Sequence, residues 1–275
     1  MVGWVTIKQL NIIDENELFA LDYNNFEINS TFIGNARVVT VDNFFKNPDK
    51  IREFSLSLPF SKKKQGYFPG VRSQIKIDTT EIKKGFTNIL QNVFKETNYK
   101  LKISELNVNM INSNFNGEFK DRDKKEYFCP HHDSLPWQNP MRFRKLFAST
   151  VWLNTPEECN GGTSFWKNKD IDSQCFLSKK YLNRMFDILK SLPSFEKECL
   201  NWVDKYTDAK KFEDSKNIEV KNKWWVESND KWELLDITEM KYNRMVMYQG
   251  IYFHTQHVQK DWFNKFPRMS LQFFM

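Results

Sequence analysis

Residues 243–257 read NRMVMYQGIYFHTQH and carry the clearest strand–turn–strand pattern in the chain. The run from Asn243 to Tyr248 is rich in apolar residues and predicts a strand. Gln249 and the glycine after it predict a turn, because glycine interrupts regular structure. The residues that follow predict a second short strand, which contains His254. The segment therefore indicates a β-rich fold.

Short runs of the same kind recur outward from this segment and are separated by Gly, Pro and Asn turns. Many short strands joined in this way are typical of an antiparallel sandwich or jelly roll. The predicted strands cover residues 106–110, 126–133, 147–153, 163–166, 232–240, 252–254 and 268–274.

The preceding part of the chain, residues 1–105, has a mixed α/β pattern that predicts a supporting layer. Short strands are expected in the first 40 residues, a helix is expected to begin near Pro48, and an apolar stripe predicts a helix within residues 79–94. Residues 106–275 would form the β core, which residues 168–229 interrupt as a charged, mostly helical insertion. No flexible boundary separates these parts, so we expect one domain over all 275 residues.

Composition excludes several classes of protein. The chain has 41 basic and 35 acidic residues, a formal net charge of +6. The basic residues are spread out and their clusters are short, which argues against nucleic acid as a partner. No apolar run could cross a bilayer and the N-terminal residues lack a secretory signal pattern, so we expect no membrane partner. Under that expectation the protein is cytoplasmic and its four cysteines are reduced.

The four histidines occur as two close pairs, and the first pair continues into an aspartate. On an extended segment His131 and Asp133 point to the same face, while His132 turns away. One imidazole from a distant strand, His254 or His257, would complete a cluster of two histidines and one carboxylate. Such clusters leave coordination positions open and are typical of non-haem Fe(II) oxygenases.

The last predicted strand begins with an arginine and a serine that share one face. Arg268 and Ser270 are two positions apart. A buried guanidinium can bind a carboxylate through two hydrogen bonds, and a serine hydroxyl can add a third. The sequence therefore predicts a carboxylate anchor beside the metal cluster.

Together these motifs resemble the Fe(II)/2-oxoglutarate-dependent dioxygenases. The HxD at residues 131–133, the later His254, the RxS at residues 268–270 and the GGTSF at residues 161–165 occur in the family's order. The last motif is similar to a strand of the prolyl-4-hydroxylase-like and phytanoyl-CoA-hydroxylase-like branch, which includes poorly characterised bacterial and viral members. The resemblance covers about residues 106–275 and implies a double-stranded β-helix, a cupin-like jelly roll.

The resemblance also implies roles for individual residues. His131, Asp133 and His254 would hold Fe(II), and Arg268 with Ser270 would hold the distal carboxylate of the cosubstrate 2-oxoglutarate. With O2, such an enzyme hydroxylates its substrate and releases succinate and CO2. An aspartate at the carboxylate position favours hydroxylation over halogenation, because halogenating relatives have a small residue there. The substrate would be an amino acid, a peptidyl side chain or another small molecule.

Some assignments stay open at this point. The context of His254, eleven positions after Asn243 in an N-R-x-V-x-Y pattern, favours it over His257 as the third ligand. A further cosubstrate contact from an earlier strand could come from one of three residues, Asn109, Asn112 or Tyr127.

Two other classes of protein compete with the dioxygenase. The first is a cupin-like metal-binding protein without oxygenase activity. The second is a nucleic-acid-binding or protein-binding module, which only the basic charge and the tryptophan content support.

Overall fold

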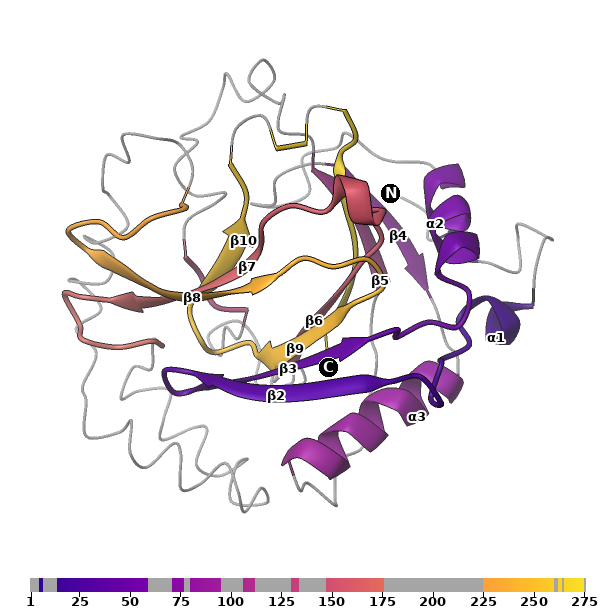
Figure 1. Cartoon of the computed structure of the whole chain (residues 1–275), viewed down its shortest axis with the longest axis horizontal. Helices are drawn as coiled ribbons and strands as arrows, with labels where there is room; N and C mark the ends of the chain where they lie inside the picture. The colour runs from indigo at the N-terminus through magenta and orange to yellow at the C-terminus, as the bar shows by residue number, and fades with distance from the viewer. Residues whose placement is uncertain are drawn as a thin grey trace.

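The computed structural model describes ten segments of the chain, and they form two β-sheets with helices beside the larger one (Figure 1). These segments are residues 5–6, 14–58, 71–76, 80–94, 106–111, 130–133, 147–175, 225–259, 262–263 and 265–274. The strands are β1 (Val5–Thr6), β2 (Glu27–Ile33), β3 (Ala36–Asp42), β4 (Val71–Lys76), β5 (Leu106–Ile111), β6 (Phe147–Trp152), β7 (Gly162–Asn168), β8 (Trp232–Glu239), β9 (Met245–Gln249), β10 (His254–His257) and β11 (Arg268–Phe274). The helices are α1 (Glu15–Leu18), α2 (Pro48–Ser57) and α3 (Thr80–Ile89). Helix α3 continues as a π-helical turn, η2 (Leu90–Phe94). A 3-10 turn, η5 (Pro156–Glu158), precedes β7.

The larger sheet has the order β1-β4-β5-β11-β6-β9-β3-β2, and the smaller sheet has the order β10-β7-β8. Neighbouring strands are antiparallel except β1 and β4. The prediction of a mainly β fold is therefore confirmed. From β6 onward the chain passes repeatedly between the sheets. Strands β6, β9 and β11 lie in the larger sheet, and strands β7, β8 and β10 lie in the smaller one.

Each face of the larger sheet packs against its own apolar core, because side chains alternate between the two faces along a strand. One core lies between α2, α3 and the outer face of the larger sheet, and the other lies between the two sheets. Residues of β11 show the division. Met269 and Leu271 belong to the outer core, so Arg268 and Ser270 point into the space between the sheets.

Most predicted elements agree with the structure. The helix begins at Pro48 as predicted, because proline fits the first turn of a helix. Two predicted strands differ from the structure. Of residues 126–133 only 130–133 are described, and there His131 forms an isolated bridge and no strand. The strand predicted at residues 252–254 begins only at His254, because Tyr252 closes a turn by donating its N–H to the carbonyl of Gln249.

The predicted helical insertion is only partly described. Its centre, residues 176–224, lies outside the described residues. The described ends are not helical: residues 168–175 consist of the end of β7, turns and isolated bridges, and residues 225–229 are irregular. Among the described residues, no helix is long and apolar enough to span a membrane.

Candidate metal and anion site

A backbone bridge joins His131 to His254 at the edge of the smaller sheet. The two residues form an isolated antiparallel bridge in which each N–H donates to the other carbonyl at 2.9 Å. Two residues further on, the Asp133 N–H donates to the carbonyl of Gly250 at 2.7 Å. These backbone bonds fix both parts of the HxD motif beside β10.

The three side chains converge on one point. The ligand atoms of His131, Asp133 and His254 all lie within 4.8 Å of one another. The Asp133 carboxylate lies 3.2 Å from His254 Nε2 and 4.0 Å from His131 Nε2. Two imidazoles and one carboxylate at this spacing can bind one divalent metal ion and leave coordination positions open.

The orientation of the His254 ring suits a metal ligand. Its Nδ1 lies 2.8 Å from the carbonyl oxygen of Tyr252, which can only accept a hydrogen bond. Nδ1 therefore carries a proton, which leaves Nε2, on the side of the Asp133 carboxylate, as the ring nitrogen that can bind a metal ion. A backbone carbonyl that fixes the ring in this way is common behind metal-bound histidines.

The other two histidines lie apart from this cluster. The ring of His132 packs edge-on against Phe253, with ring centroids 6.0 Å apart. His257 is three residues beyond His254 on β10, so its side chain points to the opposite face, where its ring lies 5.6 Å from Trp262. Burial lowers the pKa of His257. Of the two candidates for the third ligand, the structure brings only His254 to the cluster.

Arg268 is a buried cation with unused hydrogen-bond donors. Its side chain is 1% exposed, and its Nε and Nη1 have no hydrogen-bond partner. Its Nη2 reaches the carbonyl of Gly162 at a long 3.5 Å. Burial lowers the pKa of the guanidinium to about 10, and the group is still charged at neutral pH. A buried arginine in this state is expected to bind an anion.

Further unpartnered polar atoms lie on the same interior faces. Ser270 is fully buried, and its hydroxyl has no partner. Strand alternation places it beside Arg268, and places the side chain of Gln256 on the same face as His254. The buried atoms without partners on these inner faces are Trp152 Nε1, Gln256 Oε1, Arg268 Nε and Nη1, Ser270 Oγ and Gln272 Oε1.

Tyr248 connects the metal cluster to the arginine. Its ring lies 4.6 Å from the His254 ring, and the side chain is 4% exposed. Burial raises the pKa of the Tyr248 hydroxyl well above its usual value, the Asp133 charge raises it further, and the Arg268 charge lowers it. The charges of Asp133 and Arg268 thus both act on one buried hydroxyl between the sheets.

The strand register relates the position of His254 to the position that Arg268 reaches. His254 is opposite Phe165, and Gln256 is opposite Thr163, one inner-facing position further along both strands. Arg268 reaches Gly162, which is adjacent to Thr163 in the chain. Arg268 therefore reaches β7 next to the residue opposite Gln256, two positions along β10 from His254.

The two glycines of the GGTSF motif are required by close backbone contacts. A Cβ on Gly161 would lie 2.0 Å from the carbonyl oxygen of His257, and one on Gly162 would lie 2.0 Å from that of Thr238. Gly161 also has a φ of +69°, which other residues rarely adopt. The motif therefore lets β7 pack tightly between its two neighbours.

Three residues remain as candidates for a further cosubstrate contact, Asn109, Asn112 and Tyr127, and the structure describes the side chain of none of them. The backbone of Asn109 pairs with Ser270, which places β5 beside the strand that carries Arg268. Asn112 and Tyr127 lie outside the described residues. Sequence reasoning did not identify Tyr248 or Gln256 as site residues. For Gln256 the available signal was its position two residues after His254, on the same strand face.

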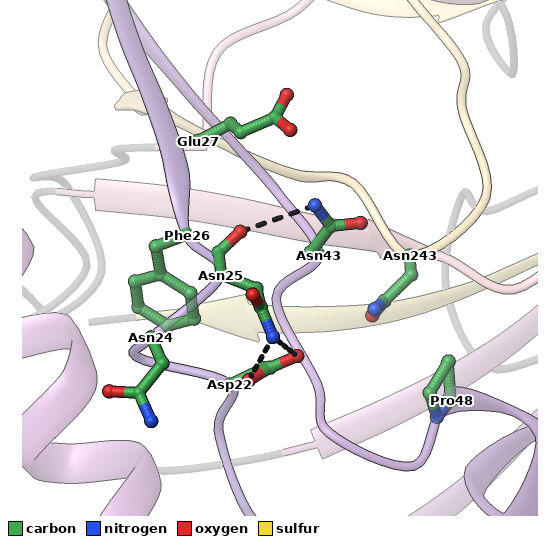
Figure 2. A pocket seen from close by; sticks show the side chains of 8 residues that line it. All are labelled: Asp22, Asn24, Asn25, Phe26, Glu27, Asn43, Pro48 and Asn243. Atoms are coloured by element: carbon green, nitrogen blue, oxygen red, sulfur yellow. Dashed lines mark hydrogen bonds between the residues drawn. The ribbon is translucent and has the colours of Figure 1, made fainter.

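A separate hollow of about 610 Å³ lies at the start of β2 (Figure 2). Its polar groups largely bond to one another: the Asn25 amide donates to both oxygens of Asp22, and the Asn43 amide donates to the Asn25 carbonyl. Asn243, also in the lining, bonds the backbone of Phe45 on both sides. These hydrogen bonds connect the segments that line the hollow, and they hold the β2–β3 region to β9.

Fold and site together define a protein of two β-sheets with a cluster of two histidines and one aspartate and, on the inner face of the larger sheet, a buried arginine. The chain belongs to a family of unknown function (DUF6445), whose model matches residues 24–191 and 189–269. Comparison with curated proteins finds no match.

Proposed function

We propose that the protein is an Fe(II)- and 2-oxoglutarate-dependent dioxygenase that hydroxylates an amino-acid, peptidyl or small-molecule substrate. One observation carries the proposal. A cluster of His131, Asp133 and His254 shares an interior with a buried arginine whose donors are unused. A metal site or an anion site alone would fit many functions. The two sites together fit a ligand that chelates the metal with one carboxylate and presents a second carboxylate to the arginine.

The donor set fits Fe(II). His131 and His254 would each supply one nitrogen and Asp133 one oxygen, which leaves positions for a chelating cosubstrate and O2. The carbonyl of Tyr252 would keep Nδ1 of His254 protonated, so that Nε2 stays available to the metal. Bound iron and 2-oxoglutarate would together supply oxidative decarboxylation to succinate and CO2, coupled to hydroxylation of the substrate.

The anion site fits the other end of the cosubstrate. Arg268 would fix the distal carboxylate through its unused Nε and Nη1, and Ser270 would donate its hydroxyl. Arg268 reaches β7 beside the residue opposite Gln256, two positions along β10 from His254, so one cosubstrate could contact both groups. Burial strengthens these contacts, because the charged hydrogen bonds form away from water.

The topology supports a double-stranded β-helix as the scaffold. Consecutive strands from β6 to β11 pass between the two sheets, and the chain needs this alternation to wind as a jelly roll. In that arrangement His131 and β10 belong to the smaller sheet, while β11 carries the arginine from the larger. The two sheets would therefore hold the metal and the distal carboxylate from opposite sides.

Turnover of 2-oxoglutarate tests the proposal directly. We expect the purified protein to form succinate from 2-oxoglutarate in the presence of Fe(II) and O2, even without substrate at a slow uncoupled rate. A protein with both His131→Ala and Asp133→Ala should form none, whereas His257→Ala should retain the activity. Succinate formation that survives the double replacement would refute the assignment. An iron-loaded protein with no affinity for 2-oxoglutarate would instead favour a metal-binding protein without oxygenase activity.

A further inference from the structure

Gln256 is an inner-facing residue of β10 that the proposed metal and anion ligands do not include. It follows His254 on the same strand face and is opposite Thr163 on β7. Its Oε1 is buried and has no hydrogen-bond partner. A buried amide oxygen in this state is destabilising unless another group completes its hydrogen bonds, so the residue needs an explanation.

The guanidinium of Arg268 reaches the part of β7 that pairs with Gln256. Its Nη2 contacts the carbonyl of Gly162, the residue before Thr163, so the guanidinium reaches the same end of the smaller sheet as Gln256. Arg268 has unused donors and Gln256 has an unused acceptor, yet the two side chains do not bond to each other. A third group with both acceptors and donors, in contact with both side chains, would complete these hydrogen bonds.

An amide can serve an anion in this position. Rotation about the last side-chain bond exchanges Oε1 and Nε2, which have nearly the same size, so Gln256 can present an N–H to a carboxylate. The side chain is partly exposed although its oxygen is buried, so it borders the interior without being locked into the core. An apolar residue would fill the volume equally well, but it could not bind a charged group.

We infer that Gln256 is a specificity-determining residue: together with Arg268 it binds the distal carboxylate of the 2-oxo acid, and so selects dicarboxylates over monocarboxylates. The inference rests on the proposed function and deepens it. The first carboxylate and the oxo group would lie at the metal cluster near His254, one strand position away. A monocarboxylic 2-oxo acid would bind at the metal but would leave Gln256 without a charged partner.

Binding measurements on two variants test the inference without relying on activity. Gln256→Leu keeps the approximate size and removes the hydrogen bond, and Gln256→Glu places a negative charge beside the guanidinium. Dissociation constants for 2-oxoglutarate and for 2-oxobutyrate would be measured on the Mn(II)-loaded protein by calorimetry. Asn29→Asp, on the exposed face of β2, changes the net charge equally and serves as the control.

We expect weaker 2-oxoglutarate binding by about tenfold for Gln256→Leu and by about 100-fold for Gln256→Glu, since hydrogen bonds to charged groups are among the stronger ones. Binding of 2-oxobutyrate and of Mn(II) should change less than about twofold in both variants and in the control. Unchanged 2-oxoglutarate binding in the leucine variant, or equal losses for the two acids, would overturn the inference and leave the proposed function intact. A parent protein that binds Mn(II) but not 2-oxoglutarate would overturn both.

Discussion

Replacing Arg268 by methionine should make the ligand-free protein more stable while it abolishes 2-oxoglutarate binding. Arg268 is 1% exposed and lacks partners at Nε and Nη1, so the folded protein holds an uncompensated charge. Methionine has an unbranched side chain that can fill the same space without charge. Most single substitutions lower stability, which makes the expected rise informative.

The size of the effect follows from the guanidinium pKa. Burial lowers that pKa from its ordinary value of 12.5 to about 10, which corresponds to a destabilisation of roughly 3 kcal/mol at neutral pH. A lowered pKa on a basic group means that the folded state resists the charged form. The destabilisation is therefore present at every pH below about 10, and it is relieved only as the pH rises through that value. Loss of the long contact to Gly162 offsets part of the gain, so we expect a net stabilisation of about 2 kcal/mol.

Thermal unfolding with and without 2-oxoglutarate measures both effects. A gain of about 2 kcal/mol should raise the midpoint by about 4–8 °C in a chain of this size. The parent protein should gain stability on addition of 2-oxoglutarate with Mn(II), and the variant should not. Arg52→Met is the matched control. Arg52 bonds both carboxylate oxygens of Glu158, so its replacement should lower the midpoint.

A variant less stable than the parent would contradict the view that Arg268 is an unpaired buried charge. A variant that still gains stability from 2-oxoglutarate would contradict its role as the carboxylate anchor. The two results are independent, because one is measured without ligand and the other with it.

Three further changes probe the metal ligands, the buried histidine and the link between β9 and the N-terminal strands. His254→Ala should weaken Mn(II) binding by about 100-fold or more in calorimetry, whereas His257→Ala should leave it nearly unchanged; equal losses would contradict the ligand assignment. Because burial lowers the pKa of His257, the folded protein resists its protonation and loses stability as the pH falls below the ordinary value of 6.5. His257→Gln should therefore lose less stability than the parent between about pH 7.5 and 5.5 in urea titrations, and an identical loss would argue against this origin. Asn243→Ala should lower the free energy of unfolding by about 2–3 kcal/mol, because Asn243 bonds Phe45 twice and has a φ of +57°. An unchanged urea midpoint would show that these bonds contribute little.

The choice between His254 and His257 shows where sequence reasoning reaches its limit. The two residues are three positions apart on one short strand, so they must point to opposite faces. The neighbouring sequence favoured His254, but which face points inward depends on how the smaller sheet packs against the larger. Phe165, opposite His254, belongs to the core between the sheets, and this packing turns His254 toward Asp133.

Local patterns in the sequence determined most of the strands, the helix that begins at Pro48, and the short list of residues able to hold a metal or a carboxylate. These features depend on neighbours within a few positions, where alternation and turn residues act directly. The pairing of His131 with His254, the burial of Arg268 and the position of Gln256 opposite Thr163 were decided only by the tertiary structure. They depend on strand register and sheet packing between distant parts of the chain, and a one-residue change of register would turn each of these side chains to the opposite face.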